Sequence, residues 1–225
     1  MFNLLAPSAF DFKAIFSNVL SEWYYYLTFI LIVLAVIFFV VKFKPQEKVE
    51  LKKTHKLSII AILSALCVIA NIFSFGSDFV KFSFVSVVCF IAGFTLGPIG
   101  GLAVGFIGDF LAGIIFPFGV YNPIIALGSA LFGFIPGIIF HYFKGNNIIK
   151  TVVSFIICYV VCSVLLNTTA TYFMYLHGNS AKYQTVFAYL VARVPTTAIT
   201  QGINLVISIL LLPALNKIKE TLLKK

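Results

Sequence analysis

A hydrophobic segment at residues 93–113 carries seven glycines and one aspartate, and it constrains the fold more than any other part of the chain. Five of its residues follow at intervals of four and lie on one helix face: Gly97, Gly101, Gly105, Asp109 and Gly113. In a bilayer, small residues let a neighbouring helix approach closely, and an aspartate on the lipid side is costly. The segment predicts a buried helix at the centre of a membrane bundle, with Asp109 inside it.

The composition points to the same fold class. Of 225 residues, 61% are hydrophobic and 10% are charged, which is typical of an integral membrane protein. The net charge of +9 comes from lysines placed between apolar stretches, so it indicates loop topology rather than a nucleic-acid partner. The four cysteines lie in apolar stretches, which favours packing over disulfides or a metal site. We predict an all-α integral membrane helical bundle.

The order of apolar and polar stretches predicts five regions. Residues 1–22 form an interfacial segment, 23–42 an extra transmembrane helix behind an aromatic belt, and 43–56 a basic linker. A six-helix domain follows at 57–217, with a tail at 218–225. Its six spans are predicted at residues 57–75, 82–96, 97–117, 121–141, 148–176 and 185–215.

The distribution of basic residues predicts the orientation. The loop at 42–56 is the most basic and should be cytoplasmic. Twelve of the sixteen basic residues then lie inside, three lie outside, and Arg193 lies within the membrane. The N-terminus is therefore expected outside and the C-terminus in the cytoplasm.

The last apolar stretch carries a polar stripe that is a candidate binding surface: Arg193, Thr197, Gln201 or Thr200, Asn204 and Ser208. Arg193 lies in the outer half of the bundle, where its guanidinium can hold a carboxylate through two parallel hydrogen bonds. This suits an anionic solute that enters from outside. The alternatives are that Arg193 forms a structural ion pair with Asp109, or that its side chain extends to the membrane interface. Pro195 should kink the helix and free nearby backbone carbonyls.

Further candidate ligands lie on other spans. Ser163, Asn167 and Thr171 share a face of the 148–176 span, with Thr168 beside them. Such residues often join helices to one another, so binding and packing roles both stay open. Asp109 is a candidate ligand or a buried structural partner. Asn122 lies in one of the outer loops that we expect to close over the solute.

Two motifs resemble a known family. The segment AILSA, with Ala61 and Ala65, the glycine-rich segment and six spans in order over residues 55–217 resemble the S components of energy-coupling factor (ECF) transporters. These small bacterial membrane proteins bind a vitamin for import. The LLNT at 165–168 and the Ala-Arg ending at Arg193 are most similar to folate-type S components. That pattern continues with a Lys-Asn pair where this chain has Thr196 and Thr197.

The resemblance implies a multi-pass protein of the bacterial plasma membrane that captures a vitamin from outside. A separate transmembrane coupling subunit with two ATPases would drive release inward. Asn167 and Arg193 would border the pocket, and Ala61 and Ala65 would pack against the coupling subunit. The chain has no GxxxxGK[ST] loop, so ATP hydrolysis would belong to the partners. No cofactor is implied.

Several alternatives stay open. The vitamin is best matched to folate, but pantothenate, thiamine or a queuosine precursor fit the same family. A proton-coupled secondary transporter that uses Asp109 is a second class. The spans contain no paired acids, Ser–His pair or clustered histidines, so we expect no catalytic residue, no metal site and no enzyme.

Overall fold

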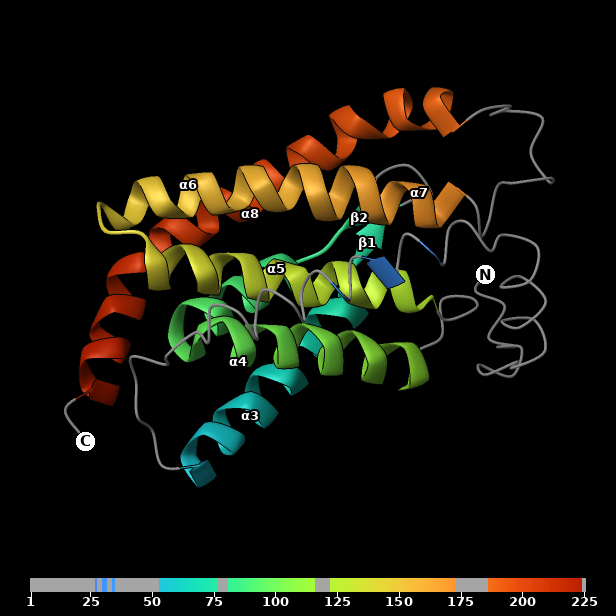
Figure 1. Cartoon of the computed structure of the whole chain (residues 1–225). Coiled ribbons are helices and arrows are strands. Elements are labelled where there is room, and N and C mark those ends of the chain that lie inside the picture. Colours follow the sequence, from blue (N-terminus) through green and yellow to red (C-terminus); the bar gives the residue numbers. More distant parts are fainter. Residues whose placement is uncertain are drawn as a thin grey trace.

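The computed structural model describes residues 53–76, 81–115, 122–172 and 186–223, together with four helical positions between 27 and 34. The predicted segments at 1–22 and 23–42 therefore lie almost wholly outside the described residues. Figure 1 shows the elements in chain order. They are α3 (Lys53–Ile72), β1 (Phe75–Gly76), β2 (Lys81–Phe82), α4 (Val85–Ile115), α5 (Pro123–Tyr142), α6 (Asn147–Cys158), η1 (Tyr159–Asn167), α7 (Thr168–Thr171) and α8 (Val186–Leu223).

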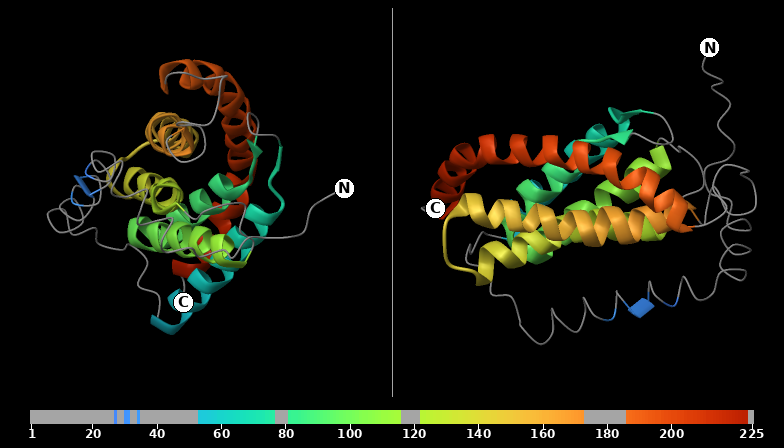
Figure 2. Two further views of the ribbon diagram at one scale, coloured as in Figure 1. Left: turned by 90° about the vertical axis from the view of Figure 1, so that its right-hand side faces the viewer. Right: turned by 90° about the horizontal axis from the view of Figure 1, so that it is seen from above.

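The described chain is a bundle of long helices that run side by side (Figures 1 and 2). Five helical stretches are long and apolar enough to cross a membrane, with α6, η1 and α7 forming one of them. The predicted all-helical membrane bundle is confirmed at this level. Its one departure is a small antiparallel hairpin, in which β1 pairs with β2 between α3 and α4.

The helix α4 is folded back on itself at Gly97. This residue has φ 81° and ψ −175°, which glycine adopts without strain, and Pro98 disfavours a helical conformation in the residue before it. A Cβ at Gly101 would lie 2.8 Å from the Cα of Gly93, whereas eight residues of straight helix span about 12 Å. The expectation that Gly97 belongs to the helical glycine face was therefore wrong, because Gly97 forms the turn between two arms.

The helix α5 packs against both arms of α4 through backbone contacts. A Cβ at Gly93 or at Gly101 would collide with the carbonyl oxygen of Gly133 on α5. A Cβ at Gly105 would meet the backbone of Ser129 and Ala130 in the same way. The close approach predicted from the glycine face is confirmed, and the helix that approaches is α5.

The helix α3 packs against the second arm of α4. A Cβ at Gly108 would lie 2.5 Å from the Cβ of Cys67, so α3 also depends on a glycine for its contact. Ser64 and Cys67 face this contact and are buried, whereas Ala61 and Ala65 are exposed. The small-residue pair therefore lies on the outer face of α3.

The predicted span at 148–176 is not a uniform α-helix. Its middle part, η1, is a π-helix of nine residues between α6 and α7. The N–H and the hydroxyl of Thr168 both donate to the carbonyl of Ser163, five residues earlier, and the hydroxyl bond is 2.8 Å long. Such turns are rare and occur frequently at functional sites. Nothing in the spacing of apolar residues predicted it.

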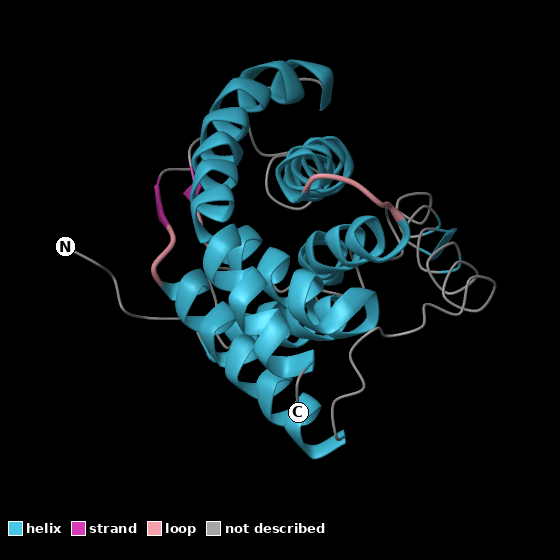
Figure 3. Ribbon diagram, turned by 90° about the vertical axis from the view of Figure 1, so that its left-hand side faces the viewer, coloured by secondary structure: helices cyan, strands magenta, loops and turns pink. Residues whose placement is uncertain are grey.

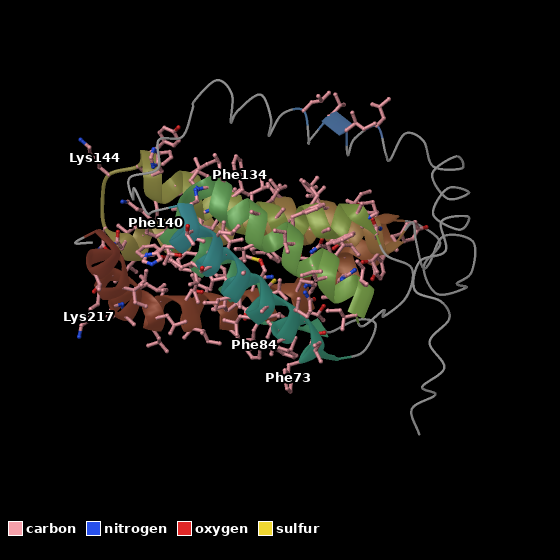
Figure 4. All side chains as sticks on the ribbon, turned by 90° about the horizontal axis from the view of Figure 1, so that it is seen from below. Phe73, Phe84, Phe134, Phe140, Lys144 and Lys217 are labelled. Carbon is pink, nitrogen blue, oxygen red and sulfur yellow. The ribbon has the colours of Figure 1, made fainter. Side chains whose placement is uncertain are left out.

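Cysteine and phenylalanine side chains are buried in the interior of the bundle. The four cysteines are free and at most 1% exposed, which confirms their packing role. Phe90, Phe94, Phe140 and Phe155 form an aromatic cluster in which the rings of Phe94 and Phe140 lie edge to face at 4.8 Å. Figure 4 shows Phe140 inside the bundle and Lys144 and Lys217 projecting at the same end.

Candidate functional site

The site centres on Asn167, where η1 meets α5. A Cβ at Gly128 of α5 would lie 2.5 Å from the Oδ1 atom of Asn167. Glycine has no side chain, so this position leaves room for the Asn167 carboxamide. Within the described part of the chain, Oδ1 is buried and has no hydrogen-bond partner. A buried acceptor without a partner costs roughly 1–3 kcal/mol. The protein therefore keeps an unpaired acceptor at this position.

Gln201 brings a second unpaired acceptor from α8. Its Nε2 atom donates to the hydroxyl of Ser163 on η1 at 3.4 Å. Its Oε1 atom is buried and, among the described residues, has no partner. Two carboxamide oxygens from facing helices, Asn167 and Gln201, are thus available to N–H or O–H donors of a ligand. Both oxygens are covered by protein, so a ligand reaches them only when the surrounding side chains move.

Arg193 lies beside the buried Tyr189, which in turn lies next to the buried Tyr172. Its Nη1 atom donates to the hydroxyl of Tyr189 at 3.0 Å, and its Cζ atom lies 5.6 Å from the centre of that ring. The ring of Tyr172 on α7 lies 6.0 Å from the ring of Tyr189. A guanidinium has five N–H groups, and the bond to Tyr189 uses one of them. The cluster therefore combines a cationic donor with aromatic surface.

Hydroxyl groups donate hydrogen bonds to two backbone carbonyls near Pro195. The Thr197 hydroxyl donates to the carbonyls of Arg193 and Val194 at 3.0 and 3.1 Å. The Tyr159 hydroxyl, at the start of η1, donates to the Val194 carbonyl at 2.8 Å. The carbonyls of Arg193 and Val194 are thus bonded inside the protein, and the Thr197 hydroxyl already donates its proton there.

The remaining candidates make local structural contacts. Asp109 is half-buried between α4 and α5 and accepts a bond from the Ser129 hydroxyl at 3.2 Å, which confirms that it lies inside the bundle. Asn122 is 7% exposed, and its Oδ1 caps α5 by accepting from the N–H of Ile124 at 2.9 Å. Thr168 is 1% exposed and donates to η1, as described above.

The structure joins some of the predicted residues and adds others. It brings Gln201 of α8 against Ser163, four residues before Asn167 on η1, and places Arg193 eight residues before Gln201 on α8. Gly128, Tyr172 and Tyr189 were not predicted. Tyr189 lies four residues before Arg193, so helical spacing alone could have found it. The positions of Gly128 and Tyr172 depend on how the helices are rotated against one another. In the described ranges, no three His, Cys, Asp or Glu residues lie close enough to hold a metal ion.

Comparisons with known proteins place this chain in a family. Residues 55–212 match the family described as "ECF transporter, substrate-specific component". The crystal structure of FolT bound with folic acid superposes with a TM-score of 0.58 and 24% sequence identity, over 70% of this chain and 90% of FolT. That likeness shows a shared fold. A comparison with curated proteins found no match. Because the family match extends over more than half of its residues, the chain belongs to the substrate-specific components of ECF transporters.

Proposed function

We propose that the protein binds folate from the outer side of a bacterial plasma membrane and hands it to an ECF transporter. The observation that carries the proposal is the arrangement of Arg193, Gln201 and Asn167. Arg193 and Gln201 are eight residues apart on α8, about 12 Å along a helix. Folate is elongated, with carboxylates at one end and a pterin ring that carries N–H donors at the other. A cationic donor and two carboxamide acceptors complement these two ends.

Three further observations support folate over pantothenate, thiamine or a queuosine precursor. FolT, which has a similar fold, binds folic acid. The Leu-Leu-Asn-Thr segment ending at Thr168 resembles folate-type S components. Tyr189 lies beside Arg193, with Tyr172 next to Tyr189, which suits a ligand with aromatic rings and so favours folate over pantothenate.

The family also supports a division of labour with partner subunits. We propose that a transmembrane coupling subunit and two ATPases drive release, since this chain lacks a P-loop. The exposed pair Ala61 and Ala65 on α3 is the proposed contact with the coupling subunit. We further propose that the two arms of α4 count as separate spans, which gives the binding domain six, with the C-terminus in the cytoplasm.

The test is mass spectrometry of small molecules released when the detergent-purified protein is denatured, followed by calorimetric titration with folic acid. Co-purified folate, or folic acid that binds to the emptied protein, supports the proposal. A different vitamin in the released fraction would keep the family and refute folate. If neither folic acid nor a panel of vitamins binds, the proposed role in vitamin capture is wrong.

A further inference from the structure

Asn204 joins α8 to the start of α4. It is 1% exposed, and its Nδ2 atom donates to the carbonyl of Ser83 and to the hydroxyl of Ser86, both at 2.9 Å. An amide nitrogen carries two hydrogens, so both are used. The partners are 121 and 118 positions away in the sequence. The side chain therefore fixes two distant parts of the fold to each other.

The segment that Asn204 holds is the irregular link between β2 and α4. Backbone groups outside regular structure need protein partners within a membrane bundle, because lipid offers none. The Phe84 carbonyl accepts from the N–H groups of Val87 and Val88, and the Ser83 hydroxyl accepts from the N–H of Val85. The Ser83 carbonyl accepts from Asn204. Asn204 thus supplies the bond that this segment receives from another helix.

We propose that Asn204 is a positioning residue that holds the β1–β2 hairpin and the first turn of α4 against α8, and that it thereby slows release of the bound ligand. Figure 3 shows the two strands beside the long helix α8, and β2 contacts α8 directly. Asn204 follows Gln201 by three residues and so lies near it on one helix face. The inference about release rests on the proposed function, and the inference about position does not.

The link to release follows from the covered site. The unpaired oxygens of Asn167 and Gln201 are buried, so the side chains around them must move for a ligand to exchange, and α8, which carries Gln201, is expected to shift with them. A shift of α8 also strains the bonds from Asn204 to Ser83 and Ser86. The same two hydrogen bonds therefore oppose opening of the site and movement of the hairpin.

The test compares Asn204→Leu, which keeps the size of the side chain but removes its donors, with the wild-type full chain in nanodiscs. Hydrogen exchange of residues 81–88, measured without ligand, should become about tenfold faster, as expected for a segment that loses two hydrogen bonds to a neighbouring helix. The release rate of radiolabelled folic acid should rise by about the same factor. Gly202→Ala is the control, because Gly202 lies on α8 two residues before Asn204 and a Cβ there would meet nothing within 4 Å.

Unchanged exchange at 81–88 in the folded Asn204→Leu variant would overturn the positioning role. Faster exchange with unchanged release would overturn its effect on the ligand. If the wild type does not bind folic acid, the proposed function fails, and the exchange measurement still decides the positioning role. Should Asn204→Leu not fold, Ser86→Ala removes one of the two bonds and should give a smaller change in the same direction. If Asn204→Leu does fold, adding Ser86→Ala to it should cause no further change, because Asn204→Leu has already removed the bond between Asn204 and Ser86.

Discussion

At the scale of single residues, the site depends on polar groups that are held without being fully paired. Arg193 donates to Tyr189 and keeps further N–H groups, while Asn167 and Gln201 hold buried oxygens without partners in the described chain. Unpaired buried acceptors lower stability, so a ligand that supplies donors regains that free energy on binding. A molecule of similar shape without those donors does not, and this difference gives selectivity.

Arg193→Ala should weaken folic acid binding by about 10- to 150-fold, because a hydrogen bond to a charged group contributes roughly 1.5–3 kcal/mol. Arg193→Lys should recover only part of this loss, since lysine keeps the charge but not the paired donors. Titration calorimetry measures both variants, and Lys217→Ala at the far end of α8 is the control. Wild-type affinity in Arg193→Ala would contradict the assignment.

Gly128→Ala should reduce folic acid affinity by about tenfold, because a Cβ at this position lies 2.5 Å from the Asn167 oxygen and forces the carboxamide to turn. Gly202→Ala on α8 is the matched control, since a Cβ at Gly202 meets nothing within 4 Å. Asn167→Ala should add little to the loss already caused by Gly128→Ala. Fully additive losses would show that Gly128 does not act through Asn167.

At the scale of helices, glycine determines how α3, α4 and α5 pack. The arms of α4 meet at Gly93 and Gly101, and the Gly133 carbonyl lies against both, so this junction is made of backbone atoms. Close packing of this kind gives helices a unique register, because even one added methyl group must displace a neighbouring backbone.

Gly101→Ala should lower the stability of the ligand-free protein by about 1–3 kcal/mol, the range for overpacked cores. A Cβ here would lie 2.7 Å from the Gly133 carbonyl carbon and 2.8 Å from the Gly93 Cα, and neither can move without shifting a helix. Thermal unfolding in detergent, followed by circular dichroism, measures the change against Gly202→Ala. Equal midpoints for the two variants would mean that the junction relaxes without cost.

The helical pattern, the role of the glycine face and the interior position of Asp109 could be predicted from sequence, because spacing and the cost of polar groups in lipid determine them. The boundary between the spans at 82–96 and 97–117 was predicted where α4 turns, but Gly97 itself was assigned to the helix although Gly-Pro is a turn signal. The π-helix could not be predicted, because it gives the sequence no distinct spacing of apolar residues. The pairing of Asn167 with Gly128 could not be predicted either, because it depends on how η1 and α5 are rotated against each other.

At the scale of the whole molecule, the candidate binding site and the proposed coupling surface lie on different helices. The candidate site lies among α5, η1 and α8, whereas Ala61 and Ala65 lie on the exposed face of α3. A substitution on α3 can therefore affect the proposed partner contact and leave the site intact.

Ala61→Trp should bind folic acid like the wild type and abolish ATP-dependent uptake in cells that contain the partner subunits, because a bulky side chain prevents close helix contact. Val206→Trp is the control, since Val206 is a 56% exposed residue on α8, away from the proposed contact. Uptake is measured with radiolabelled folic acid. Normal uptake by Ala61→Trp would exclude this face as the coupling surface.

The π-helix also has a consequence for the evolution of this family. A nine-residue stretch with five-residue hydrogen bonds accommodates an inserted amino acid without displacing the helix ends. A homologue shorter by one amino acid between Tyr159 and Asn167 would wind this stretch as an ordinary α-helix with its ends in place, and side chains between the ends, such as Ser163, would turn by up to about 100°. Insertions and deletions in η1, more than substitutions, are therefore expected to mark where ligand preference diverged among homologues.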